Sequence, residues 1–573
     1  MLTIKTLKWD VGYTEILKKG TLALLTTFGA GLLFGNENMM IAFVLILGSS
    51  VLAQQNLRIK TGYKLLRLIA VDLLIVLTAF IASLNQWVAI PINFITLFLI
   101  IYLTVSPYHQ MAYKTFMMLF VFCQYTSVPL AALPNRMLMV VMTVTIIVIS
   151  IYLEQRRSKA LLSSQIGESF KLLTKQLFKM TEGTWDEKLS EAITQQMNEL
   201  AYLIYTTGYR RYFTTYVGKI HFHFYLNISY LNVLLKQMQM KESNKELKKE
   251  QILDIYQLFI QIENYFNRVL SLQNLIEAFN HYLNRQRESE EAIEEITQVI
   301  SALRKNFVEL EVLPYKEKNK PYNEWKRSEL SAIRGKIKGE FTPKSMRFNF
   351  AIRMASILTV MLFLAPIVGF YKFIWVIIPI MSITQPYYED TKRRKKDRIK
   401  SNILASIAIG VLINGLHVRW VTIGVLILAF YLIYAYKDYY HMSIFLTIIS
   451  MSVASVSKGI NILVIYRIIY VLIGAGIVEL ISRLKPYKLE DGINELIEEI
   501  GRLDAIIKEE YQISLKEEAD LDRIREAIIY LTILCQKLET KNKQYQSETV
   551  KRCVIESRKS AVSIGHSVLR NSS

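Results

Sequence analysis

Four arginines stand in or beside long apolar stretches of this chain, at positions that match in pairs. Arg467 follows Arg136, and Arg398 follows Arg67, by the same 331 residues. A charged side chain in the centre of a membrane costs roughly 2.5 to 3.5 kcal/mol or more, so each of these residues calls for a reason. Two symmetric guanidiniums near a shared axis could hold a carboxylate through bidentate hydrogen bonds. The spacing therefore predicts anion binding by Arg136 and Arg467, with Arg67 and Arg398 as a cationic vestibule.

Each of these arginines also has a structural interpretation. Arg136 stands at the end of an apolar run, where snorkelling to the membrane surface or pairing with a local carbonyl explains it equally well. Arg467 lies inside an apolar run, and for it a binding role and a structural role both stay open.

Other polar or aromatic side chains complete the candidate pathway. Trp375 offers a face on which an aromatic substrate could stack. Gln54 and Gln385 offer donors where two short apolar runs end, and short or interrupted spans at matching positions point to a substrate site. Arg353, near the start of the seventh apolar run, is a further candidate.

One carboxyl group is a candidate for ion coupling. Asp72 lies about one turn into the third apolar run. It could carry a proton, or it could form a salt bridge to a nearby lysine or arginine.

Motifs for enzymatic chemistry are missing from the sequence. There is no Gly-x4-Gly-Lys-Ser/Thr phosphate loop, no His-Glu-x-x-His helix and no Gly-x-Ser-x-Gly elbow. His221 and His223 are two residues apart and would not share a helix face, so no metal site is expected. We therefore expect no catalytic residues, no metal and no cofactor, and a protein that is not an enzyme.

The elements that must position these residues are twelve apolar runs, in two blocks of six. Hydrophobic residues make up 52% of the 573-residue chain, more than a soluble protein normally carries, which predicts an all-α polytopic membrane protein. The first block has runs near 20–34, 39–53, 68–83, 88–105, 116–130 and 137–153. The second has runs near 350–367, 373–384, 403–416, 420–436, 442–456 and 463–482.

The basic residues indicate the topology. Lysines and arginines gather before the first run, between the second and third runs, and after the sixth, which predicts a multi-pass cell membrane protein with both termini in the cytoplasm. The cluster from Lys392 to Lys400 is explained by the same rule and by contact with anionic lipid. The net charge of +20 is thus a membrane signal, and no nucleic acid partner is expected.

The matching offsets predict two parallel six-span repeats, related by a pseudo-two-fold axis along the membrane normal. The expected domains are a cytoplasmic segment (1–19), a first transmembrane block (20–153), a cytoplasmic helical domain (154–343), a second transmembrane block (344–484) and a helical tail (485–573). Within the cytoplasmic parts we expect a continuous helix over Lys245 to Arg285. The tail carries the apolar spacing of a bundle or coiled-coil face at Ile493, Leu496, Ile497, Ile500 and Leu503.

The second block resembles a known family in its residues. Arg353, Trp375-Val376, Gln385-Pro386, Thr391, Arg398 and Arg467 are similar to the pattern of the fusaric acid resistance (FUSC-like) or aromatic acid exporter family. The plan of two six-span blocks with large cytoplasmic helical parts also resembles that family. The resemblance implies efflux of organic anions, typically aromatic carboxylates, across the cytoplasmic membrane.

The leading hypothesis is therefore a secondary exporter of small organic anions, with its pathway between the two repeats. A passive anion channel is the first alternative, because no proton carrier other than Asp72 stands out. A membrane scaffold that acts through its helical domains is the second alternative. A homo-oligomer or a cytoplasmic protein partner is compatible with each hypothesis.

Overall fold

The structure is a computed structural model of the 573-residue chain. It describes residues 10–52, 57, 61–105, 112–157, 161–207, 214–240, 245–285, 291–314, 320, 341–342, 345–369, 372–416, 419–436, 438–455, 460–484, 486–514 and 521–571. The regular elements in these residues are helices, as the sequence predicts, and none is a β-strand.

The chain divides into two compact units. One unit, here called the membrane unit, consists of Met1–Gln155 and Ile337–Gly492. The other, here called the helical unit, consists of Arg156–Lys336 and Ile493–Ser573. The last segment of the chain thus joins the middle segment in one compact body, whereas the sequence analysis treated the two as separate domains.

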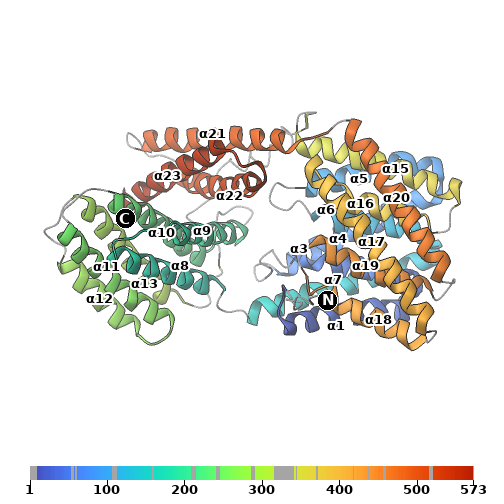
Figure 1. Ribbon diagram of the computed structural model, residues 1–573, viewed down its shortest axis with the longest axis horizontal. Helices are drawn as coiled ribbons and strands as arrows, with labels where there is room; N and C mark the ends of the chain where they lie inside the picture. Colours follow the sequence, from blue (N-terminus) through green and yellow to red (C-terminus); the bar gives the residue numbers. More distant parts are fainter. Residues whose placement is uncertain are drawn as a thin grey trace, which may run out of the picture. The chain divides into compact units, whose positions relative to one another are not determined.

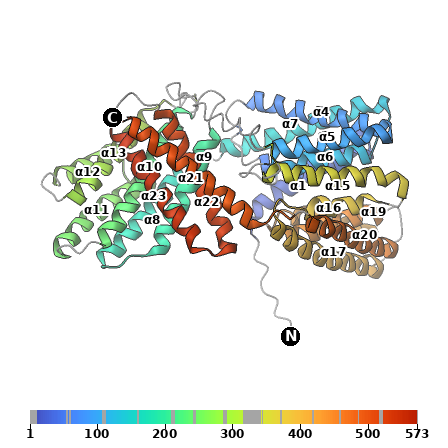
Figure 2. The ribbon, with the colours of Figure 1, turned by 90° about the horizontal axis from the view of Figure 1, so that it is seen from above.

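The membrane unit contains two series of helices (Figures 1 and 2). The first series is α1 (Tyr13–Phe34), α2 (Met39–Leu47), α3 (Ser49–Leu52), α4 (Thr61–Leu84), α5 (Gln86–Thr104), α6 (Ala112–Tyr125) and α7 (Leu133–Arg157). The second is α15 (Met346–Val368), α16 (Ile374–Ile383), α17 (Tyr388–Leu416), α18 (Arg419–Leu432), α19 (Tyr439–Ser455) and α20 (Ile460–Leu484). Each of the twelve predicted apolar runs therefore contains a helix, although several helices end before the run does.

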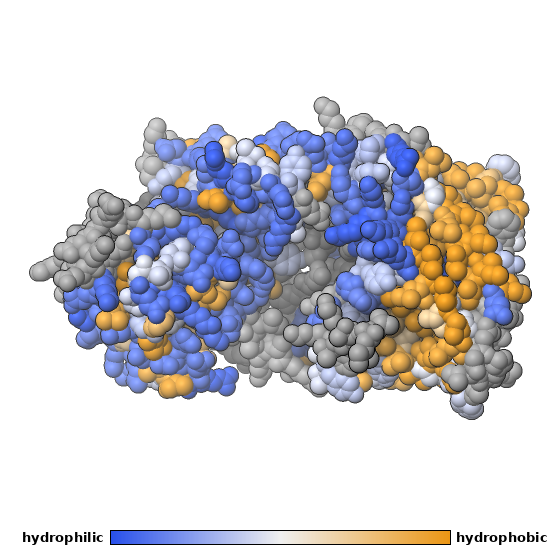
Figure 3. Space-filling model, viewed as in Figure 1, coloured by the Kyte–Doolittle hydropathy of each residue, from blue (hydrophilic) through white to orange (hydrophobic). Residues whose placement is uncertain are grey.

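Six of the described helices are long and apolar enough to cross a membrane, namely α1, α4, α5, α7, α15 and α20. The helices α2, α16 and α18 are apolar but shorter. Figure 3 shows hydrophobic side chains gathered over a face of the membrane unit, whereas the visible face of the helical unit is mainly hydrophilic. An apolar outer surface of this kind suits contact with lipid. The count of twelve crossings stays a prediction.

The two series pack against each other in a shared apolar core. Helix α15 lies against α5, and α1 lies against α18. The Gln86 side chain donates to the Phe363 carbonyl at 2.9 Å, and the Phe43 and Phe430 rings meet edge to face at 5.2 Å. Helix α1 comes close to α18 at Gly20, where an added Cβ would lie 2.9 Å from two ring carbons of Tyr431. A glycine is thus required at this crossing.

Helix α16 is the shortest of the second series and ends abruptly. It has ten residues, almost all of them buried, and contains Pro379. The backbone becomes extended at Thr384, and the Gln385-Pro386 pair separates α16 from α17. Because the residue before a proline is disfavoured in helical conformation, the break follows from the sequence.

The helical unit is a bundle of nine described helices. Those from the middle of the chain are α8 (Leu161–Thr181), α9 (Glu187–Thr207), α10 (Tyr216–Met240), α11 (Lys245–Phe266), α12 (Leu272–Arg285) and α13 (Glu291–Val312). Those from the end of the chain are α21 (Leu489–Ser514), whose residues up to Gly492 belong to the membrane unit, α22 (Leu521–Tyr545) and α23 (Glu548–Asn571). Helix α22 packs on α9 and α23 packs on α10, so the tail completes the core of the bundle.

One helix prediction in this unit was wrong. The sequence analysis expected one helix from Lys245 to Arg285, but α11 ends at Phe266 and α12 begins at Leu272. Arg268 adopts a left-handed conformation with φ 62° in the turn between them. The residues between the two helices include no glycine or proline, which is why the break was missed.

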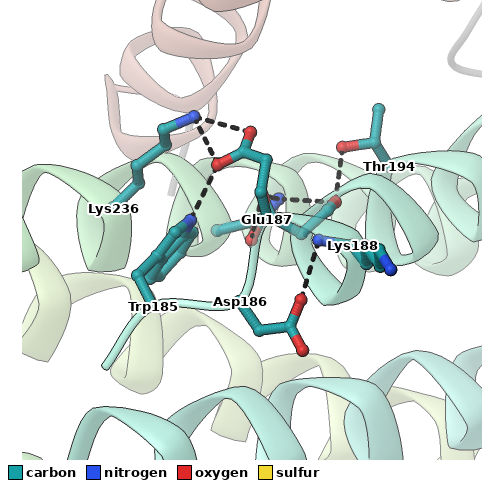
Figure 4. Close-up of polar contacts among 8 residues, drawn as sticks. Trp185, Asp186, Glu187, Lys188, Thr194 and Lys236 are labelled. Carbon is teal, nitrogen blue, oxygen red and sulfur yellow. Dashed lines mark hydrogen bonds and ion pairs between the residues drawn. The ribbon is translucent and has the colours of Figure 1, made fainter. Parts of the chain in front are cut away.

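A polar network fixes the start of α9 (Figure 4). Asp186 accepts from the backbone N–H of Lys188 at 2.9 Å, as a helix-capping residue does. The Glu187 carboxylate accepts from the Lys236 ammonium of α10 at 2.8 Å and from the Trp185 indole at 2.9 Å. The hydrogen bond from Lys236 holds the pKa of Glu187 below its ordinary value. These contacts hold α9 against α10.

Candidate anion site

Helices α17 and α19 of the membrane unit lie side by side and present matched polar residues. Arg394, Arg398 and Asn402 are spaced four apart on α17, so they share one face. The Arg394 guanidinium lies 4.6 Å from the ring centroid of Tyr439, and Arg398 Nη1 donates to Ser443 Oγ at 2.7 Å. Tyr439 and Ser443 are also four apart on α19. We call these two contacts the α17–α19 ladder.

Arg467 of α20 extends this arrangement. Its Nε donates to Asn402 Oδ1 at 3.0 Å, and Asn402 Nδ2 donates to the Arg398 backbone carbonyl at 3.1 Å. The Arg467 guanidinium lies 5.0 Å from the ring centroid of Trp375 on α16, which is a cation–π contact. One amide therefore connects two arginines. We call Arg398, Asn402 and Arg467 the arginine–asparagine cluster.

The cluster is buried and rich in hydrogen-bond donors. Arg398 and Arg467 are each 1% exposed, and Asn402 is fully buried. Among the described residues, no acceptor contacts Arg398 Nε, Arg467 Nη1 or the buried hydroxyl of Tyr439. Neither arginine forms an ion pair with an acidic side chain in the described parts of the chain. The two guanidiniums also repel each other electrostatically. A buried donor without an acceptor is costly, so this cluster suits an anion.

Small hydroxyl side chains continue the polar face beyond the cluster. Ser406 on α17 and Thr447 and Ser452 on α19 are all buried. The hydroxyl oxygens of Ser406 and Ser452 have no partner among the described residues. A buried polar stripe thus follows α17 and α19 through the apolar core.

The turn between α16 and α17 is tied to Arg353 of α15. Arg353 Nη2 donates to the Gln385 carbonyl at 2.6 Å and to the Pro386 carbonyl at 3.3 Å. The Gln385 side-chain amide donates to the Thr384 carbonyl at 2.6 Å. Thr391 Oγ1 accepts from the Gln385 N–H at 3.0 Å. Arg353 and Gln385, both predicted to line the pathway, are therefore engaged in holding this turn.

The segment after α20 also holds this turn. The Tyr388 N–H donates to the Tyr487 carbonyl at 3.0 Å, and the Leu489 N–H donates to the Glu389 carboxylate at 2.9 Å. Gly492 on the first turn of α21 lies against Tyr387, so closely that an added Cβ would stand 2.9 Å from the phenol oxygen. We call these contacts the tail clasp.

An ion-pair group lies at the end of α20 beside the basic run of α17. The Glu479 carboxylate contacts Lys395 Nζ at 2.5 Å and Arg483 Nε at 2.7 Å. This acidic residue is therefore already neutralised by two cations and does not compensate the arginine–asparagine cluster.

Arg136, the partner of Arg467 at the 331-residue offset, has a different environment. It is 2% exposed, and its Nε donates to Asn38 Oδ1 at 2.9 Å. Its Nη1 donates to the Cys123 carbonyl at 3.0 Å, and its Nη2 donates to the Thr126 carbonyl at 2.6 Å. All three nitrogens thus have acceptors, and two of them close the end of α6. This geometry favours the carbonyl-pairing interpretation for Arg136.

The second predicted pair is also unequal. Arg67 on α4 is exposed, whereas Arg398 is buried. Arg67 is therefore not part of a buried site with Arg398. Gln54 lies outside the described residues.

Asp72 of α4 is buried, at 1% exposed. Its Oδ1 has no hydrogen-bond partner, and the described residues contain no ion pair to it. The salt bridge considered from the sequence is thus not formed within these residues. Helix α4 packs on α5 and α6, so this carboxyl group lies in a helix interface of the membrane unit.

Four residues of the site were not predicted from the sequence, namely Asn402, Arg394, Tyr439 and Ser443. The four-residue spacing on α17 and again on α19 was a usable signal, because such residues share a helix face. What the spacing did not give was the pairing of α17 with α19. The described residues contain no group of three or more His, Cys, Asp or Glu side chains suited to a metal ion.

Comparison with known proteins identifies the segment that carries the site. Residues 358–481 match the family model described as fusaric acid resistance protein-like. The chain is also 32% identical over 127 residues to the inner membrane protein YccS of Escherichia coli (strain K12). That similarity covers 21% of this chain and 17% of the relative's length. No solved structure matches the chain significantly. The resemblance predicted from the sequence is confirmed, and the protein is a membrane protein whose residues 358–481, which include the arginine–asparagine cluster, are fusaric acid resistance protein-like.

Proposed function

We propose that the chain is a membrane transporter of small organic anions, aromatic carboxylates among them. The observation that supports this most directly is the arginine–asparagine cluster. It has two buried guanidiniums with unpartnered donors and no acidic partner in the described residues. A carboxylate would accept from Arg398 and Arg467, and its aromatic body would lie near the Trp375 ring.

We also propose that the membrane unit consists of two parallel six-helix repeats. At the 331-residue offset α1 corresponds to α15 and α5 to α18, and the structure has α15 against α5 and α1 against α18. Such a reciprocal exchange is what a two-fold arrangement produces. On the distribution of basic residues we propose that both termini and the helical unit lie in the cytoplasm.

In this proposal the two repeats have different roles. Arg136 supports the first repeat, while Arg467 in the second repeat binds the anion. Arg394 on α17 raises the anion concentration at the cytoplasmic entrance and begins the path toward the cluster. Asp72 is the group proposed to couple export to a proton gradient, since it is a buried carboxyl without a cationic partner in the described residues.

The test is flux through proteoliposomes that contain the full chain. A panel of aromatic carboxylates such as benzoate is loaded with and without an imposed pH gradient. Saturable flux is expected for the native protein and for Arg393→Gln, a control arginine on α17 whose side chain is 64% exposed. Arg467→Gln is expected to lose at least about tenfold of the flux, which corresponds to about 1.4 kcal/mol of binding.

The pH arm separates an exporter from the alternative, a passive channel. Flux that rises with the pH gradient in the native protein but not in Asp72→Asn supports a proton-coupled exporter. Flux that follows the anion gradient alone supports a channel. Equal flux in Arg467→Gln and the native protein would refute the proposed site.

A second candidate function is that of a membrane scaffold that binds other proteins through its helical unit. This unit is a compact body of its own, larger than the cluster needs for support. If folded protein moves none of the anions in the panel, the scaffold becomes the better explanation. The partner would then be sought with the full chain as bait.

A further inference from the structure

We infer that the arginine–asparagine cluster holds a small inorganic monovalent anion of the chloride class as its counter-ion. The organic anion must displace this ion, a competition that rests on the proposed function. The chloride site itself is argued from the geometry of the cluster alone.

The cluster carries two buried positive charges. Arg398 and Arg467 repel each other and are both 1% exposed. Glu479, an acidic residue on α20, is already paired with Lys395 and Arg483. Two like charges in an apolar core are strongly unfavourable without a compensating charge. Water can accept their hydrogen bonds but cannot neutralise them.

Three buried hydrogen-bond donors in and beside the cluster have no acceptor in the described residues. Arg398 Nε, Arg467 Nη1 and the Tyr439 hydroxyl are buried and have no acceptor among the described residues. A halide accepts several N–H and O–H donors without demanding a fixed direction, unlike a carbonyl oxygen. The chemistry of these three groups therefore suits a spherical anion.

Asn402, which lies between the two arginines, is uncharged. Its amide accepts from Arg467 and donates to the Arg398 carbonyl, so both of its ends are used. Aspartate has nearly the same shape and would pair with Arg467 directly. An amide at this position leaves the cluster with a net positive charge. The Trp375 ring stabilises the charge on Arg467 through the cation–π contact but does not neutralise it.

The experiment measures chloride binding to the purified full chain in detergent. Chlorine NMR linewidths are recorded in sodium gluconate buffer with chloride added at constant ionic strength, then with benzoate added. The native protein and Arg393→Gln are expected to broaden the chloride signal, and benzoate is expected to remove the broadening. Asn402→Asp and Arg467→Gln are each expected to lose it.

A second readout guards against misfolding of the variant. In chloride-free buffer, Asn402→Asp is expected to melt at the same temperature as the native protein or higher, because it supplies the missing charge. Chloride should raise the melting temperature of the native protein but not of Asn402→Asp. A purely structural role for Asn402 predicts a lower melting temperature with no chloride dependence in either protein.

The outcomes separate the two proposals. Equal broadening by the native protein and Asn402→Asp would overturn the chloride site. Broadening that requires Asn402 but resists benzoate, in protein without carboxylate flux, would retain the chloride site and refute the proposed function.

Discussion

Arg136 and Arg467 show how far one residue type can diverge in its surroundings. Arg136 uses all three guanidinium nitrogens on neutral oxygens, two of which are carbonyls at the end of α6. Arg467 uses Nε alone on a side-chain acceptor and leaves Nη1 without one in the described residues. One arginine therefore closes a helix end, and the other is available to a ligand.

This contrast makes a prediction about stability. Arg136→Gln is expected to destabilise the protein by about 2 to 4 kcal/mol, because it leaves buried acceptors without donors. Arg467→Gln removes one of two charges that repel each other and is expected to cost clearly less. The measurement is the thermal unfolding midpoint of each purified variant in detergent, with Arg393→Gln as the control. Equal midpoints for the two variants would contradict the assigned difference.

Residue type and spacing gave part of the site. Arg398, Arg467 and Trp375 were selected because charged and aromatic residues in apolar runs need a reason, and the structure brings all three to one cluster or its edge. Arg67 could not be distinguished from Arg398 by its offset, since burial depends on neighbouring helices. Asn402 was missed because its amide is uncharged, and the residues in apolar runs were selected by charge or aromatic character.

At the scale of elements, the tail clasp joins the start of α21 to the α16–α17 turn. The Tyr487 carbonyl accepts from the Tyr388 N–H, the Leu489 N–H donates to the Glu389 carboxylate, and Gly492 fits against Tyr387. The same turn receives Arg353. The position of this turn is therefore set from two directions.

Two glycines of α21 provide a matched test of the clasp. Gly501→Ala is expected to stabilise the protein by about 0.5 to 1 kcal/mol, because alanine favours a helix and nothing lies within 4 Å of the new Cβ. Gly492→Ala gains the same propensity but overlaps Tyr387, so it is expected to destabilise the protein by about 1 to 3 kcal/mol. Thermal unfolding of both variants gives the signs. If Gly492→Ala stabilised the protein, Tyr387 would have to move away from the new Cβ without destabilising the tail clasp, which contradicts the prediction.

The helices themselves were the most predictable part of the fold. Their apolar runs are long, and a chain in lipid must satisfy its backbone hydrogen bonds within each helix. The packing of α15 on α5 and of α1 on α18 could not be predicted, because it depends on fits such as Gly20 against Tyr431.

At the scale of the whole molecule, the two units are expected to respond differently to acid. His223 lies half-buried in α10 of the helical unit, and its pKa is lowered from 6.5 to about 3, first of all by this burial. Lys219 and Arg525 contribute to the lowering of the pKa, while a hydrogen bond with Asn306 opposes it. Below pH 6.5 the unfolded chain takes up a proton that the folded unit excludes. The helical unit therefore loses stability as the pH falls from about 6.5 toward 3.

The expected loss at pH 5 is up to about 2 kcal/mol, since one pKa unit corresponds to about 1.4 kcal/mol. Hydrogen exchange of α10 peptides in the full chain, corrected for the intrinsic pH dependence, measures it. His223→Gln keeps a side chain that can form hydrogen bonds but does not titrate, so this variant should show a smaller loss of stability between pH 7 and pH 5. The same loss in both proteins would assign the acid response to another group.

The four-residue spacing of Arg394, Arg398 and Asn402 sets the distance between successive polar partners along α17. Four residues of an α-helix rise about 6 Å, which is shorter than the roughly 8 Å over which salt screens a charge. In the proposed transport, an anion that leaves one rung of the α17–α19 ladder would therefore already lie within the field of the next. Its passage would divide into short transfers between neighbouring partners, and no single transfer would require complete separation from a positive charge.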